Sequence, residues 1–213
     1  MTQELGYERY GTQGGDWGAI ITTRMAANHP EHLAGTHLNM VMAPIPEQPG
    51  PEDAPYIEAR KRWQSLETGY SALQGTKPAS LAIAQSDSPA GIAAWIVEKF
   101  RTWSDCDGDI ESVYTKDQLL TNIMFYWAPN SIDSSARMYW ESRRDAPLPP
   151  GKFKVPIGVA QFAKEIYRSR PSWCEGMFDV RRWTEFEHGG HFAALEHSTE
   201  LIQEVREFFR PLR

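Results

Sequence analysis

A glycine-rich peptide at positions 14–18, with the sequence GGDWG, constrains the fold of this chain more than any other feature. The apolar run Ala-Ile-Ile follows it directly. Glycines two residues before and two residues after Asp16 allow a strand to turn sharply into a helix. Such a turn pushes its central side chain outward, as the pattern G-x-S-x-G does for a serine nucleophile. We therefore expect Asp16 to be an accessible nucleophile, although an aspartate in a glycine-rich turn also serves as a simple turn or cap residue.

Composition narrows the class of protein. The chain has 213 residues, of which 41% are hydrophobic, and this length supports one substantial core. A net charge of -6 and a pI near 5.5 argue against a surface that binds nucleic acid. The first ten residues are mostly polar, and no stretch approaches the run of about 18 apolar residues that spans a membrane. We expect no secretory signal and no membrane association of this chain.

The cysteines and histidines of the sequence indicate neither disulfide bonds nor a metal-binding site. Cys106 and Cys174 are the only cysteines, too few for a disulfide framework, and a reducing compartment suits them. No two histidines have the sequence spacing of a zinc site. We therefore expect a cytoplasmic protein with no cofactor and no metal ion.

Two proline-rich stretches, at 44–55 and 147–156, divide the chain because proline interrupts both helices and central strands. The segment between them has helical patterns, and the flanking segments alternate strand and helix, which predicts parallel βαβ units. The expected fold class is α/β, a partial and mostly parallel sheet with an inserted helical lid, and the expected domains are 1–43, 44–150 and 151–213. The predicted strands are 33–42, 153–161 and 181–188, and the predicted helices are 19–28, 57–66, one after Ser88, one after the capping box at Thr115, 132–143 and 201–209.

Two further residues follow predicted strands and complete a catalytic order. Glu165 lies just after the apolar run at 155–160, and His191 lies in the peptide HGGHF at 188–192. Nucleophile, acid and then histidine is the chain order of α/β-hydrolases, and parallel sheets gather such residues at the carboxyl ends of their strands. Taken singly, Glu165 is more often a solvated charge and His191 a loop histidine; together with Asp16 they predict a catalytic triad.

The chain resembles epoxide hydrolases of the microsomal and juvenile-hormone type. The resemblance is carried by GGDWG at 14–18, by DSPAG at 87–91 leading into EKF at 98–100, and by GGHFAA at 189–194. Further similarity lies in TKP at 76–78 and TNIM at 121–124. These motifs are spread over essentially the whole chain.

This resemblance implies a role for each site residue. Asp16 attacks an epoxide carbon to form a covalent ester, Glu165 orients His191, and His191 activates the water that hydrolyses the ester. Tyr70 and Tyr139 correspond to the two lid tyrosines that protonate or hydrogen-bond the epoxide oxygen. The phenol group suits this role because its reference pKa of about 10 keeps it protonated at neutral pH. The backbone N-H of Trp17 contributes to the oxyanion hole.

The resemblance also implies that part of the family's fold lies outside this sequence. In the family the nucleophile follows the fifth strand, and a His-Gly-x-Pro loop supplies the rest of the oxyanion hole. Here the nucleophile is already at residue 16 and that loop is absent. We expect an N-terminally truncated chain whose first strand is an exposed edge, through which copies of the chain self-associate.

The expected activity is the opening of a small apolar epoxide by water to a vicinal diol. Haloalkane dehalogenase is an alternative, since it uses the same aspartate ester, but it needs donors for a halide ion where this chain has tyrosines. A catalytically silent remnant is the other alternative, because half of the oxyanion hole is missing. Loss of one oxyanion donor typically costs about 2.7 to 4 kcal/mol.

Overall fold

The computed structural model describes residues 1–213, which divide into two compact units. The first, here called the sheet unit, comprises Met1–Arg60 and Leu148–Arg213. The second, here called the helical unit, is Lys61–Pro147. Residues 44–60, which we expected to belong to the lid, pack with the sheet unit. Asp53 binds Arg170 and Trp173 at 2.6 and 2.8 Å, and Arg60 donates to the backbone carbonyl of Ala43 at 3.1 Å.

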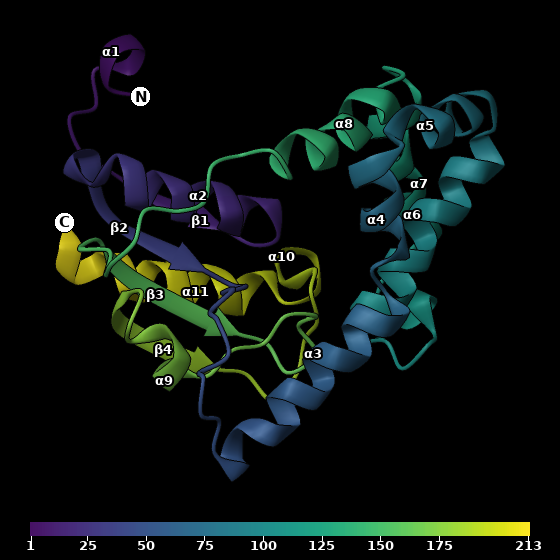
Figure 1. The fold of residues 1–213 in the computed structure, drawn as a ribbon. Helices are drawn as coiled ribbons and strands as arrows, with labels where there is room; N and C mark the ends of the chain where they lie inside the picture. Colours follow the sequence, from purple (N-terminus) through teal and green to yellow (C-terminus); the bar gives the residue numbers. More distant parts are fainter. The chain divides into compact units, whose positions relative to one another are not determined.

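The sheet unit contains four parallel strands in the spatial order β1-β2-β3-β4 (Figure 1). This confirms the expected partial α/β fold. β1 stands at the edge of the sheet and pairs only with β2. The strands are β1 (Tyr10–Gly14), β2 (Leu33–Leu38), β3 (Pro156–Gln161) and β4 (Asp179–Glu185).

Three strands have bounds that differ from the predicted ones. β2 ends at Leu38 instead of 42, because the following residues turn to Ser169, whose hydroxyl donates to the carbonyl of Val41. β3 begins at Pro156 instead of 153, since the N-H of Phe153 donates to the carbonyl of Met177. β4 ends at Glu185, and residues 186–188 already belong to the loop that leads to His191.

The sheet is covered on both faces by helices of the sheet unit. α2 (Trp17–Asn28) packs against β1 and β2, and α11 (Ser198–Phe209) packs against β2 and β3. Phe208 of α11 lies over Gly158, where an added Cβ atom would come within 2.5 Å of the ring. The remaining elements of the sheet unit are the helices α1 (Thr2–Leu5), η1 (Pro30–His32), η2 (Pro51–Asp53), α9 (Pro171–Cys174), α10 (Ala193–Glu196) and η4 (Arg210–Leu212), and the first part of α3 (Ala54–Leu66).

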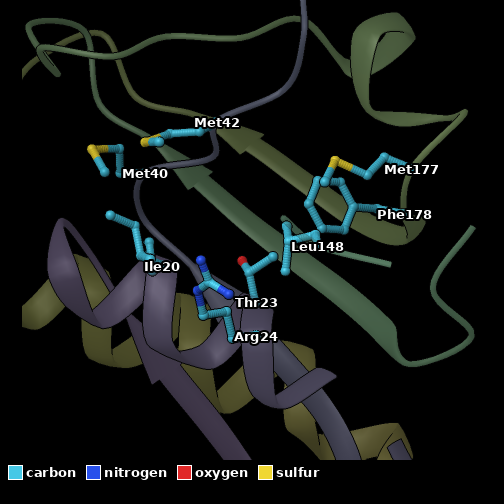
Figure 2. Close-up of a pocket in the computed structure, with 9 residues that line it drawn as sticks. Ile20, Thr23, Arg24, Met40, Met42, Leu148, Met177 and Phe178 are labelled. Carbon is cyan, nitrogen blue, oxygen red and sulfur yellow. The ribbon is translucent and has the colours of Figure 1, made fainter. Parts of the chain in front are cut away.

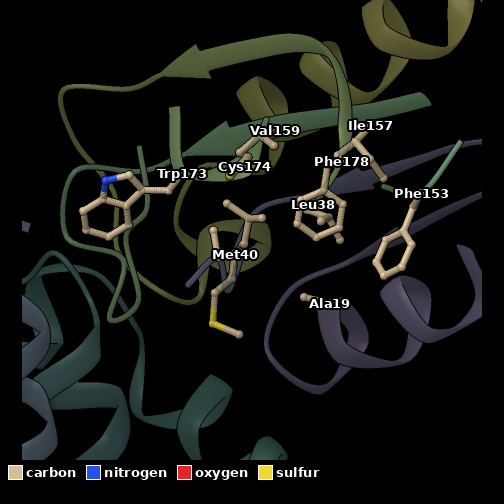
Figure 3. Packing of buried hydrophobic residues seen from close by; sticks show 11 residues of the cluster. Ala19, Leu38, Met40, Phe153, Ile157, Val159, Trp173, Cys174 and Phe178 are labelled. Atoms are coloured by element: carbon tan, nitrogen blue, oxygen red, sulfur yellow. The ribbon is translucent and has the colours of Figure 1, made fainter. Parts of the chain in front are cut away.

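Beside α2 the sheet unit has an apolar pocket of about 200 Å³. Figure 2 shows Ile20 and Thr23 of α2 on one side, Met40 and Met42 above, and Met177 and Phe178 opposite. It adjoins the main hydrophobic core, in which Leu38, Ile157, Val159 and Phe178 are almost fully buried (Figure 3). Because side chains alternate along a strand, Leu38, Ile157 and Val159 occupy the face of the sheet opposite to Phe208. The core therefore fixes α2, and with it the turn that carries Asp16.

The helical unit consists of helices alone. Ser88 caps α6 by accepting from the N-H of Gly91, and Thr115 and Gln118 form a capping box before α7, so both predicted starts are confirmed. Two helices, α4 and α5, were not predicted individually. Besides the last part of α3, the helices are α4 (Gly69–Thr76), α5 (Pro78–Asp87), α6 (Pro89–Trp103), η3 (Ile110–Ser112), α7 (Lys116–Trp127) and α8 (Ile132–Ser142). None of the helices in the structure is both long and apolar enough to cross a lipid bilayer.

Candidate active site

Asp16 lies in the sharp turn between β1 and α2. Its backbone has φ 48° and ψ -124°, an unfavourable combination for a residue with a Cβ atom. Gly14 makes this turn possible, since an added Cβ atom there would lie 2.2 Å from the backbone of Gly18. At Gly15 an added Cβ atom would lie 2.4 Å from the side-chain amide of Asn39. The turn leaves the Asp16 side chain 39% exposed, as an attacking carboxylate requires.

The structure brings Asp16, His191 and Glu165 into one hydrogen-bonded chain. The Nε2 atom of His191 lies 2.9 Å from Oδ2 of Asp16, and its Nδ1 atom lies 2.7 Å from Oε1 of Glu165. Only 3% of the His191 side chain and 1% of the Glu165 side chain are exposed. The arrangement thus presents one accessible carboxylate backed by a buried histidine and a buried acid.

The loops after β3 and β4 hold Glu165 and His191 together. Lys164 and Gly190 form a parallel bridge that extends the pairing of these strands, and the N-H of Lys164 donates to the carbonyl of Gly189 at 2.9 Å. Oε1 of Glu165 also accepts from the backbone N-H of Ile166 at 2.7 Å. The acid is therefore oriented by its own loop before it meets the histidine.

Electrostatics favour a charged histidine in this arrangement. Burial opposes a charge on His191, but the negative charge of Glu165 and the hydrogen bonds with Asp16 and Glu165 raise the pKa of His191 to about 10. Burial raises the pKa of Glu165 from its ordinary value, and the charge of His191 counteracts that rise. A protonated His191 can donate one ring N-H to Asp16 and the other to Glu165.

A hollow of about 310 Å³ opens beside Asp16 and His191 within the sheet unit. Gln13 and Asn39 contribute polar groups to it and are joined by a hydrogen bond of 2.9 Å. Its wall also includes apolar side chains of the α10 region. The lining residues are Gln13, Gly15, Asp16, Asn39, His191, Phe192, Ala194, Leu195 and Leu201. The hollow combines apolar surface with a nucleophile.

The sequence alone did not indicate Glu196, which holds the loop that carries His191. Its Oε2 atom accepts from the N-H of Gly190 at 2.9 Å, and its Oε1 atom accepts from the N-H of Phe192 at 3.0 Å. Both carboxylate oxygens thus bind the backbone on either side of the histidine. Hydrogen bonds to a charged acceptor are the stronger kind, so Glu196 fixes the position of this loop.

Tyr70 and Tyr139 meet within the helical unit. Their ring centroids are 5.7 Å apart in an edge-on arrangement, and Trp103 lies 5.2 Å from Tyr70. The Lys99 ammonium lies 5.1 Å from the ring centroid of Tyr70. The two tyrosines that sequence reasoning selected from distant parts of the chain are therefore neighbours. Trp17 is the first residue of α2, next to Asp16.

No protein-family model matches the chain. A protein of Stigmatella aurantiaca, provisionally named an epoxide hydrolase, is 40% identical over the whole chain and 49% of its own length. Epoxide hydrolase 1 of Sus scrofa is 34% identical over 96% of the chain and 51% of its own length. The crystal structure of juvenile hormone epoxide hydrolase from Bombyx mori superposes with a TM-score of 0.86 at 31% identity, and the match covers the whole chain and 57% of that structure.

Along nearly its whole length the chain is similar to epoxide hydrolases of the α/β-hydrolase fold. The structure of Aspergillus niger epoxide hydrolase, with a TM-score of 0.86 at 25% identity, agrees with this placement. The chain spans about half the length of the curated epoxide hydrolases it matches. The resemblance drawn from the sequence motifs is confirmed.

Proposed function

We propose that this chain carries the machinery for opening an apolar epoxide to a vicinal diol through a covalent ester on Asp16. The observation that supports the proposal best is the chain of hydrogen bonds from Asp16 through His191 to Glu165, with the nucleophile exposed and its partners buried. The similarity to named epoxide hydrolases supports the choice of substrate class.

In the first step a carboxylate oxygen of Asp16 forms a bond to an epoxide carbon. The carbon-oxygen bond of the ring breaks, and its electron pair stays on the ring oxygen. Tyr70 or Tyr139 gives its phenolic proton to that oxygen, which leaves a hydroxyalkyl ester and a tyrosinate. A positioned acid of this kind contributes about 10² to 10⁴ in rate.

Ester formation changes the chemistry of His191. It removes the charge of Asp16 and one of the two hydrogen bonds that hold the histidine protonated. His191 can then release its proton, which passes through solvent to the tyrosinate, and becomes a neutral base. Glu165 keeps the imidazole oriented through Nδ1.

In the second step His191 takes a proton from water, and the resulting hydroxide attacks the carbonyl carbon of the ester. The backbone N-H of Trp17 donates to the oxyanion that forms. When the carbon-oxygen bond to the diol breaks, the diol oxygen leaves with a proton, and the other proton from water remains on His191. Asp16 is again a carboxylate and His191 again an imidazolium, so one water has been added to one epoxide.

A substrate panel tests the proposed class of reaction. The purified chain would be incubated with styrene-type epoxides and with 1-haloalkanes, and diol and halide would be measured separately. We expect diol from the epoxides, no halide, and loss of the diol signal in Asp16→Asn. An exposed histidine, His29, offers the matched control His29→Gln, which should leave diol formation unchanged. Release of halide without diol would favour a dehalogenase. If neither diol nor halide forms, a catalytically silent chain is favoured.

A further inference from the structure

Three side chains outside the proposed active site converge on one spot of the sheet unit. His188 lies in the loop after β4, His197 lies between α10 and α11, and Glu200 lies in the first turn of α11. Their ligand atoms all lie within 4.8 Å of one another. Oε2 of Glu200 is 2.9 Å from Nε2 of His188 and 3.1 Å from Nδ1 of His197. The same carboxylate oxygen therefore faces both imidazoles.

These spacings suit a bound metal ion. A zinc ion lies about 2.0 to 2.2 Å from its nitrogen and oxygen ligands, so its ligand atoms stand roughly 3 to 3.5 Å apart. The two nitrogen-oxygen distances in the cluster are within a few tenths of an ångström of that range. Two imidazoles and one carboxylate also form the ligand set of zinc sites that keep a position open for water.

The surrounding backbone holds the cluster in place. His197 donates its N-H to the carbonyl of Ala193 at 2.8 Å, and its ring stacks on Phe162 at 6.3 Å between centroids. Gly189, at φ +82°, allows the His188 loop to approach, since an added Cβ atom would lie 2.8 Å from the His197 ring. Two ligands thus sit on anchored segments before any ion binds, which lowers the entropic cost of binding.

The cluster is also accessible. The side chains of His188, His197 and Glu200 are 46%, 31% and 38% exposed, so an ion can enter and water can complete its coordination. Sequence spacing did not reveal the site because only His197 and Glu200 share a helix end, at the separation i, i+3. The third ligand comes from a loop that the fold brings beside them.

We propose that His188, His197 and Glu200 form a binding site for a divalent transition-metal ion such as Zn²⁺. The site is distinct from Asp16, Glu165 and His191. A bound ion fastens the loop that leads to His191 to the start of α11, so binding should raise the thermal stability of the chain. A cluster that serves only as an ion pair would show neither binding nor this stabilisation.

Calorimetric titration of the chelator-treated chain with ZnCl₂ tests the proposal. We expect one ion bound per chain and an upward shift of Tm in the same buffer. His188→Gln and Glu200→Gln should each weaken binding by at least about tenfold and abolish the shift. The exposed His29 supplies the control His29→Gln, which should bind like the parent chain.

Two further measurements keep the test decisive. Circular dichroism establishes that the His188→Gln and Glu200→Gln variants are folded, as the partial exposure of both side chains leads us to expect. Replacing zinc by CoCl₂ should give the visible d-d absorption band of a four-coordinate cobalt ion, which His188→Gln should lose. Absence of stoichiometric binding, or equal binding in parent and His188→Gln chains, would overturn the proposal.

Discussion

At the scale of single residues, the charge of Asp16 sets the protonation of His191. The two atoms Oδ2 and Nε2 are 2.9 Å apart, and this bond helps to raise the pKa of the histidine to about 10. A residue with so high a pKa cannot act as a base near neutral pH until one of its anionic partners is neutralised. Ester formation at Asp16 provides that neutralisation.

Asp16→Asn imitates the loss of charge and gives the first prediction. The amide keeps the shape of the side chain but carries no negative charge, so His191 should lose about tenfold or more of its proton affinity. Titration of the imidazole nitrogens by NMR in parent and variant chains would measure the change. An unaltered pKa of His191 would contradict the proposed switch from acid to base.

The two neighbouring tyrosines give a second residue-scale prediction. Tyr70→Phe and Tyr139→Phe each remove one phenolic proton, and we expect ester formation to slow by about tenfold or more in each variant. Once formed, the ester should be hydrolysed at the parental rate, because His191 is unchanged. Rapid-quench kinetics separate the two steps. Tyr7, an exposed tyrosine, offers Tyr7→Phe as the control.

At the scale of elements, Glu196 connects α10 to the loop that carries His191. Glu196→Ala removes the two carboxylate oxygens that accept hydrogen bonds from the N-H groups of Gly190 and Phe192. We expect ester hydrolysis to slow by about tenfold while ester formation changes little, because the loop positions the base and not the nucleophile. Intact-protein mass spectrometry should then detect accumulated ester. Glu187→Ala, an exposed acid of the same loop, should accumulate none.

The buried His37 of β2 makes the stability of the folded chain depend on pH in the acid range. Neither ring nitrogen has a hydrogen-bond partner, and burial lowers the pKa of His37 to about 4, with the nearby Glu204 opposing that shift and Arg182 adding to it. The unfolded state therefore binds a proton between about pH 6.5 and 4 while the folded state does not, so stability falls as the pH falls through that range. Between these two pH values the free energy of unfolding falls by roughly 3 kcal/mol.

His37→Leu should remove this contribution. We expect the variant to be as stable as the parent at pH 7 or more so, because an unpartnered polar group is replaced by an apolar one. Urea unfolding at pH 7, 6, 5 and 4 should show a smaller loss of the free energy of unfolding in the variant. Parallel losses in the two chains would show that His37 does not titrate as described.

The elements also show how far sequence reasoning reaches. The caps at Ser88 and Thr115 were predictable because their side chains bind backbone groups only three residues away. α4 was not, since it contains Gly75, a poor helix former. The structure explains this glycine: an added Cβ atom would lie 2.1 Å from Arg143, a residue distant in the sequence. Local patterns predict local bonds and miss features that depend on distant segments.

The same limit applies to the candidate site. Asp16, Glu165 and His191 could be selected because each follows a strand, and parallel strands bring such positions together. Glu196, Glu200 and His188 have no such signature. The two acids lie at the end and the start of a helix, where acids are usually surface residues, and the histidine lies in a loop. Only the folded structure shows which groups these side chains contact.

At the scale of the whole molecule, the proposed chemistry draws on both units of the chain. The sheet unit holds the nucleophile, the acid and the histidine, and the helical unit holds both tyrosines. The central claim is that the oxygen of water reaches the diol only by way of Asp16. Every other step of the proposed mechanism follows from that ester.

A single-turnover reaction in ¹⁸O-labelled water tests this claim most directly. With the chain in excess over a styrene-type epoxide, mass spectrometry of the peptide that contains Asp16 should find ¹⁸O in its carboxylate, and the diol should be unlabelled. Asp16→Asn should show no label in that peptide. A labelled diol from a chain whose Asp16 remains unlabelled would mean that water attacks the epoxide directly, which would contradict the ester mechanism.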